Sequence, residues 1–169
     1  MNSMRSGVLV CVLLACAWCG WAAEIAVESR SLTIRLASPE EGMGVVGLAH
    51  RPSGTRFLKA PESASAALLW KLELTTDLAD DDAFFGLTNR NRTGVRSVGR
   101  EGDDLLLSWD KIDLPDEPDA LDVQVRITPR GRHGLGEWRI RVVNRSKRVG
   151  IYRVIFPVLE LGRIGADGG

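Results

Sequence analysis

The chain has 169 residues, of which 44% are hydrophobic, so it can form one globular domain with a core of ordinary size. Lysine and arginine together number 22, and so do aspartate and glutamate, which gives a formal net charge of +0. Because no excess of basic residues is available to bind phosphate backbones, we expect that nucleic acid is not a partner.

Residues 1–23 have the three parts of a secretory signal peptide. Arg5 precedes an apolar run from Val8 to Ala17, and the small residues Ala22 and Ala23 provide cleavage sites. The apolar run is shorter than the roughly 20 residues that a membrane span needs. We therefore predict a signal-peptide helix, no transmembrane span and export of the protein to the periplasm or the extracellular space.

The leader also contains an alternative processing site. Residues 13–16, LLAC, resemble the lipobox of bacterial lipoproteins, in which the cysteine, here Cys16, becomes a lipidated first residue that anchors the protein. Ordinary cleavage and lipidation both remain open. All three cysteines, Cys11, Cys16 and Cys19, lie in the leader, so ordinary cleavage leaves no disulfide and no thiolate metal site in the mature chain.

The dominant hydrophobic period after the leader is two, which is typical of half-buried β-strands. No segment sustains the helical i, i+3, i+4, i+7 pattern over three turns, and turn-forming residues separate the runs. We predict an all-β fold, an antiparallel β-sandwich over residues 24–161, followed at 162–169 by the start of a linker or a truncated end. The alternating runs cover residues 32–36, 68–74, 105–109, 123–127, 138–142 and 149–156.

Two segments interrupt this alternation. Residues 75–94 contain four aspartates followed by Phe84 and Phe85, and we predict that they form the longest irregular connection. Residues 113–122 combine prolines and acids, which predicts a second irregular loop. Because long loops often carry function, Phe84 and Phe85 are the candidate exposed aromatic residues for contact with carbohydrate.

Three tryptophans outside the leader have a different interpretation. Trp70, Trp109 and Trp138 lie on the aliphatic side of their alternating runs. This position favours packing in the core over a surface on which sugars stack.

The remaining candidate groups do not form a site. Asp80, Asp81 and Asp82 are consecutive, whereas a calcium loop needs ligands at fixed, separated offsets, so we predict a solvated turn. His50 and His133 are the only histidines and lie beside turn residues, and we interpret them as surface residues that do not act in acid–base catalysis. The sequence thus predicts no catalytic residue, no metal site and no cofactor.

Two segments carry a resemblance to a known family. Residues 42–58, GMGVVGLAHRPSGTRFL, resemble the opening hairpin of galactose-mutarotase-like supersandwich domains. Residues 138–162, WRIRVVNRSKRVGIYRVIFPVLELG, are similar to the late hairpin of the supersandwich domains that precede a glycoside-hydrolase-type barrel in large bacterial proteins of uncharacterised function. With LLWKLEL at 68–74 and LSWDKIDLP at 107–115, the likeness extends over most of the mature chain.

The resemblance implies a non-catalytic, exported accessory module of a carbohydrate-active, glycoside-hydrolase-like protein. It implies carbohydrate as a ligand and a missing C-terminal barrel as a partner, because in such proteins the two carboxylates that cleave the glycosidic bond belong to the barrel. The chain is then a fragment of a longer protein or a residual stand-alone module. Two alternatives stay open. One is a small mutarotase-type sugar epimerase, which needs His50 or His133 within hydrogen-bond reach of a carboxylate. The other is a structural envelope lipoprotein module with a protein partner.

Overall fold

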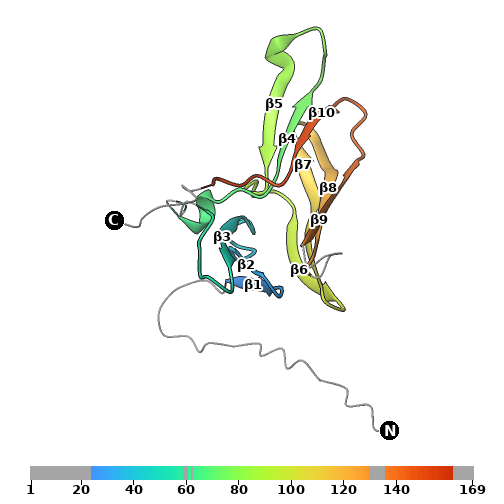
Figure 1. The fold of residues 1–169 in the computed structure, drawn as a ribbon. Helices are drawn as coiled ribbons and strands as arrows, with labels where there is room; N and C mark the ends of the chain where they lie inside the picture. Colours follow the sequence, from blue (N-terminus) through green and yellow to red (C-terminus); the bar gives the residue numbers. More distant parts are fainter. Residues whose placement is uncertain (1–23, 59–60, 62, 130–135, 162–169) are drawn as a thin grey trace.

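A computed structural model of the chain describes residues 24–58, 61, 63–129 and 136–161 (Figure 1). The predicted signal-peptide helix with Cys16, the predicted linker at 162–169 and His133 lie outside these residues. The described part contains two short 3-10 helices, η1 (Ala64–Ala66) and η2 (Asp81–Ala83), and no α-helix. No helix found there has the length and apolar character that crossing a membrane requires.

The described residues form three antiparallel sheets. The first has the order β1 (Ile25–Glu28), β2 (Leu32–Leu36), β3 (Val45–His50). The second has the order β10 (Gly150–Ile155), β4 (Lys71–Thr75), β5 (Phe84–Thr88). The third has the order β6 (Val95–Glu101), β7 (Asp104–Leu114), β8 (Glu117–Thr128), β9 (Glu137–Asn144). The prediction of an all-β, antiparallel sandwich is therefore confirmed.

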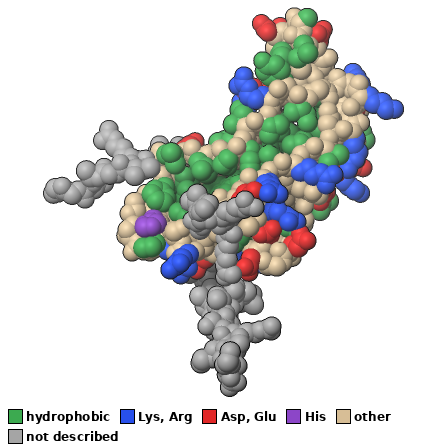
Figure 2. All heavy atoms as spheres, turned by 45° about the vertical axis from the view of Figure 1, so that its right-hand side comes forward, with side chains coloured by type: hydrophobic (Ala, Val, Ile, Leu, Met, Phe, Trp, Pro, Cys, Tyr) green, Lys and Arg blue, Asp and Glu red, His purple; other side chains and the backbone are tan. Residues whose placement is uncertain are grey.

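The sheets enclose one hydrophobic core. The Val45 N–H donates to the Leu68 carbonyl at 3.1 Å, which joins the first sheet to the chain segment that enters β4. The four-stranded sheet lies beside both smaller sheets, and the β4–β5 hairpin extends beyond the rest of the molecule (Figure 1). Strand alternation supplies the core, as in β8, where Val123 and Val125 are buried and Gln124 is exposed. On one outer face, however, hydrophobic side chains form an exposed belt (Figure 2).

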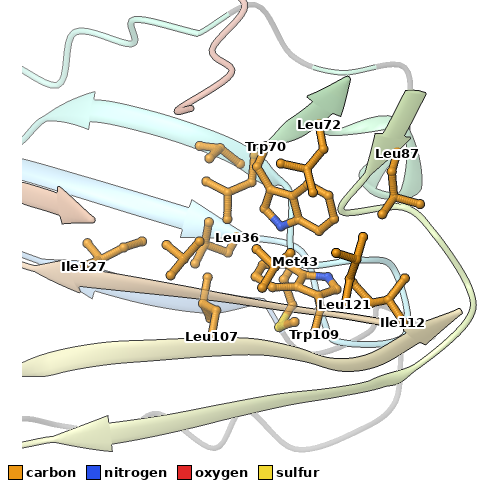
Figure 3. Close-up of a cluster of buried hydrophobic side chains, with 14 of the residues drawn as sticks. Leu36, Met43, Trp70, Leu72, Leu87, Leu107, Trp109, Ile112, Leu121 and Ile127 are labelled. Carbon is orange, nitrogen blue, oxygen red and sulfur yellow. The ribbon is translucent and has the colours of Figure 1, made fainter. Parts of the chain in front are cut away.

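Two tryptophans lie at the centre of this core (Figure 3). The Trp70 and Trp109 rings meet edge to face, with centroids 5.4 Å apart and an interplanar angle of 88°. Both side chains are fully buried, which confirms their predicted packing role. Trp138 packs against the core from β9 but is only partly buried.

A buried asparagine fixes the loops beside these tryptophans. The Asn89 Oδ1 accepts from the Leu69 N–H at 2.8 Å, and its Nδ2 donates to the Gly42 carbonyl at 2.9 Å and the Ala67 carbonyl at 3.2 Å. The Trp109 Nε1–H donates to the Asn89 backbone carbonyl at 3.1 Å. One side chain thus satisfies three buried backbone groups from two separate segments, as burial requires.

The structure corrects the prediction for the last two strands. The strands β9 and β10 do not form the predicted hairpin with each other, because β9 pairs with β8 and β10 pairs with β4 in a different sheet. The short connection between them is held by the Arg145 N–H, which donates to the Ala120 carbonyl at 2.8 Å. The crossing places Ile151 opposite Leu74. Period-two alternation identifies strands but does not identify their partners.

Both predicted irregular loops are also corrected. Phe84 and Phe85 belong to β5, which pairs with β4 from Thr75–Phe84 to Lys71–Thr88, so much of residues 75–94 is a hairpin. Residues 113–122 form the tight end of the β7–β8 hairpin, where Leu114 pairs with Glu117. Asp116 has a positive φ angle of 62° in the turn, a conformation that aspartate tolerates better than most residues, and Asp119 has one of 53° within β8.

Candidate functional site

The candidate site lies on the outer face of the β10–β4–β5 sheet. Residues paired directly across antiparallel strands share a face. The pair Leu74–Phe85 points toward the core, so the neighbouring pairs Glu73–Gly86 and Thr75–Phe84 lie on the opposite face. Phe84 and Glu73 are thus placed together on the hairpin that projects from the molecule (Figure 1).

Phe84 forms an aromatic pair with Tyr152 of β10. The two rings meet edge to face, with centroids 5.1 Å apart and an interplanar angle of 82°. The register of β10 on β4 shifts between Ile151 and Arg153, so Tyr152 is the extra residue of a β-bulge. Tyr152 remains 54% exposed, and the Arg153 guanidinium lies 5.7 Å from the centre of its ring. The pair therefore offers aromatic surface to solvent.

Charged side chains flank the aromatic pair. The Lys71 Nζ lies 3.1 Å from the Glu73 Oε1, and the Arg153 Nε lies 3.3 Å from the Glu73 Oε2. Glu73 is consequently held between two cations from the same sheet, which fixes its position next to Gly86.

These groups surround a shallow hollow with a volume of about 480 Å³. Gly86 contributes no side chain, which leaves room between the charged and aromatic groups. Aromatic rings in a hollow with a few fixed polar groups are typical of small-molecule contact sites. The lining residues are Lys71, Glu73, Asp81, Phe84, Phe85, Gly86 and Tyr152.

The two sequence-predicted contact residues have different positions. Phe84 contributes its ring to the aromatic pair, whereas Phe85 lines the hollow but also packs against the core from β5. Tyr152 was not predicted as a contact residue, because the bulge that turns its ring toward Phe84 leaves no pattern in the sequence. Its one available signal was that the chain has a single tyrosine, located in a predicted strand.

The acidic segment before Phe84 is an exposed turn, as predicted. Asp80, Asp81 and Asp82 are all exposed, and the Asp80 Oδ1 accepts from the Asp82 N–H at 3.0 Å. Within the part of the chain that the structure describes, no cluster of histidine, cysteine or acidic side chains is arranged to hold a metal ion.

His50 lies at the end of β3, outside the hollow. Its Nδ1 lies 2.8 Å from the Ser53 Oγ, which in turn lies 2.7 Å from the Thr55 Oγ1. Among the residues described, no carboxylate forms an ion pair with His50. The His50 ring thus bonds to the Ser53 hydroxyl, whereas the epimerase alternative needs a carboxylate.

Two acidic groups on the β7–β8 hairpin, Asp110 and Asp122, have shifted pKa values. A hydrogen bond from Arg145 holds the pKa of Asp122 below its usual value. Burial raises the pKa of Asp110, and the negative charge of Asp122 adds to this increase. The Asp122–Arg145 ion pair connects the segment after β9 to β8. We therefore attribute these pKa shifts to contacts that stabilise the fold and not to a catalytic site.

No family model, curated protein or solved structure matches the chain in comparisons with known proteins.

Proposed function

We propose that the chain is a non-catalytic β-sandwich module that contacts carbohydrate through the hollow around Phe84 and Tyr152, as an accessory part of an exported, glycoside-hydrolase-like protein. The observation that carries the proposal is the exposed aromatic pair next to the fixed Lys71–Glu73–Arg153 charges. Sugar rings present both C–H faces, which pack on aromatic rings, and hydroxyls, which pair with charged groups.

The shape of the hollow favours weak contact. It is shallow, and Tyr152 keeps more than half of its surface exposed, so a bound sugar would remain partly solvated. The two carboxylates that line it are Glu73, engaged by two cations, and Asp81, which is exposed. A glycosidase needs two carboxylates at a set separation across the scissile bond, with one in an environment that keeps it protonated. The proposal therefore assigns contact to this surface and assigns no bond cleavage to it.

Calorimetric titration of the full chain with a panel of plant and bacterial polysaccharides tests the proposal. We expect dissociation constants of about 0.1–1 mM for a shallow site of this kind. Phe84→Ala and Tyr152→Ala should each weaken binding by about tenfold, and Tyr152→Phe, which keeps the ring, should weaken it much less. Phe57→Ala, an aromatic truncation after β3, is the matched control and should leave binding unchanged.

Two results would overturn this assignment. One is binding that neither Phe84→Ala nor Tyr152→Ala changes, with circular dichroism showing that both variants are folded. The other is turnover of a glycoside by the purified chain.

Export is part of the same proposal and has its own test. It is supported by Arg5 and the apolar run from Val8 to Ala17. N-terminal sequencing of the secreted product should find a first residue directly after Ala22 or Ala23, or an acylated Cys16 under the lipoprotein alternative. An intact Met1 would contradict both routes.

A further inference from the structure

The strand β9 has an unpaired edge. All eight of its residues pair one to one with β8 without a register shift, from Thr128–Glu137 to Leu121–Asn144. In the described ranges no strand pairs with its other side. It contains no proline and no bulge, two of the devices that commonly prevent an edge strand from binding another strand, although it does carry charged side chains.

The inward side chains of β9 are incompletely covered. Trp138, Ile140 and Val142 pack against the core, yet each is only partly buried. The Trp138 ring lies 6.3 Å from the Phe156 ring, centroid to centroid, and Phe156 is also partly buried. These side chains therefore leave part of their apolar surface open to solvent.

The same part of the chain is strongly basic. Residues 137–155 contain six basic residues and one acid, although the whole chain has a formal net charge of +0. Arg139 pairs with Glu137 within β9. Arg141, Lys147 and Arg148 have no ion-pair partner in the part of the chain that is described. The outward face of β9 and the connection that follows it therefore favour an acidic partner.

We propose that the β9 edge binds an extended segment of a partner protein by strand addition, and that apolar and acidic residues alternate in this segment. The backbone of the added strand would satisfy the open edge, as in other complexes formed by strand addition. Its apolar side chains would cover Trp138, Ile140 and Val142, and its acids would lie beside Arg139 and Arg141. This surface is separate from the carbohydrate hollow, so it does not depend on the function proposed above.

A second copy of the chain fits this edge less well. An antiparallel pair of β9 strands centred on Ile140 places Arg139 of one copy opposite Arg141 of the other. A pair centred on Arg139 places that arginine opposite itself. Like charges directly across a strand pair are destabilising, so these two central registers disfavour a second copy, whereas an acidic strand meets opposite charges in both.

Labelled synthetic peptides titrated into the full chain test this inference by fluorescence anisotropy. A peptide of alternating valine and glutamate should bind at least about tenfold more tightly than one of alternating valine and lysine. Its affinity should fall on going from about 50 mM to about 300 mM salt, because the added ions screen exposed charges. Hydrogen exchange should show new protection of the residue 137–144 amides when the glutamate peptide is bound.

Charge reversal locates the binding surface. Arg141→Glu should weaken binding of the glutamate peptide by about tenfold. Arg56→Glu, which makes the same change next to the first sheet, should leave it unchanged. Absence of binding, equal binding of both peptides, or protection of a different strand would overturn the inference. Protection of residues 137–144 that rises with protein concentration without peptide would identify a second copy as the occupant, and would overturn the assignment of an acidic partner.

Discussion

Trp109 and Trp138 lie in the same sandwich but differ in how completely the protein buries them. Trp109 is 1% exposed, contacts Trp70 edge to face and donates its indole N–H to Asn89. Trp138 belongs to an edge strand, is partly buried and has Phe156 as its aromatic neighbour. The interior around Trp109 is therefore closed by the chain itself, whereas the edge around Trp138 leaves apolar surface exposed.

The difference indicates where stability and where binding reside. In the closed interior, apolar burial and buried hydrogen bonds support the same arrangement, because Asn89 bonds both to Gly42 and to the segment at 67–69. One exception is the Trp70 Nε1–H, which is buried without a hydrogen-bond partner among the described residues. At the open β9 edge, apolar side chains keep part of their surface in contact with water. A partner could cover this surface, as at other protein interaction sites.

The largest expected contrast is between the two tryptophans. Trp109→Ala removes a fully buried ring and a hydrogen bond, and should lower the free energy of unfolding by about 4 kcal/mol. Trp138→Ala removes a half-covered ring and should lower it by about 1–2 kcal/mol. Urea unfolding followed by circular dichroism measures both. Equal losses would show that the β9 edge is as closed as the interior.

Close backbone packing gives a second contrast. A Cβ atom at Gly44 would lie 2.1 Å from the Ala67 carbonyl oxygen, so Gly44→Ala should lower the free energy of unfolding by about 3 kcal/mol. Gly99 in β6 has open space around it, and Gly99→Ala should change stability by less than about 0.5 kcal/mol. A tolerated alanine at position 44 would mean that the loops around Asn89 can separate at little cost.

Two asparagines extend the comparison to polar groups. Asn89→Ala would leave buried groups of Leu69, Gly42 and Ala67 without a partner, and should lower the free energy of unfolding by about 2–3 kcal/mol. Asn144 is exposed at the end of β9, and its Nδ2 donates to the Val149 carbonyl at 2.8 Å. Asn144→Ala should cost about 0.5–1 kcal/mol in the same denaturant series. The reverse order would contradict the assignment of stability to the interior.

The sequence was sufficient to predict the fold class, because alternation in runs such as 105–109 and 123–127 is a local signal of one buried strand face. The sequence was also sufficient to predict the packing of Trp70 and Trp109, because large apolar residues on the buried face of a strand pack into the core. It was insufficient for the crossing from β9 to β10, because a short polar connection fits a hairpin and a change of sheet equally well. The strand pairing depends on contacts such as that between Ile151 and Leu74, which lie far apart in the sequence.

The candidate site could be predicted from the sequence only in part, for a related reason. Phe84 was predicted as a contact residue, but in an irregular loop. The four aspartates that precede it are typical of loops, so the start of β5 could not be recognised. Phe85 was assigned the same role although the next position along a strand points to the opposite face. Tyr152 could not be paired with Phe84 before the bulge in β10 was known. The site combines residues of three strands, so a sequence pattern that extends over only a few residues cannot predict it.

The smallest expected effect is on the pH dependence of stability. It tests whether the Asp122–Arg145 ion pair holds the segment after β9 against β8. The pKa of Asp122 is lowered in the folded state by the hydrogen bond from Arg145, so ionised Asp122 contributes stability above its unfolded pKa, about 4. That contribution is lost as the pH falls through the lower, folded pKa. Asp122→Asn should therefore destabilise the protein at pH 7, and the difference from the wild type should disappear in strong acid.

Asp110 provides the matched control, because its shift has the opposite sign. Its pKa is raised by burial, so ionised Asp110 opposes folding at neutral pH, and this penalty disappears as the pH falls below the unfolded pKa. Asp110→Asn should stabilise the protein slightly at pH 7 and have no effect in strong acid. Denaturant midpoints measured from pH 7 down to about pH 3 compare both variants with the wild type. If Asp122→Asn has no effect at any pH, the connection from β9 to β10 is held by backbone contacts such as Arg145 N–H to Ala120, and the ion pair is incidental.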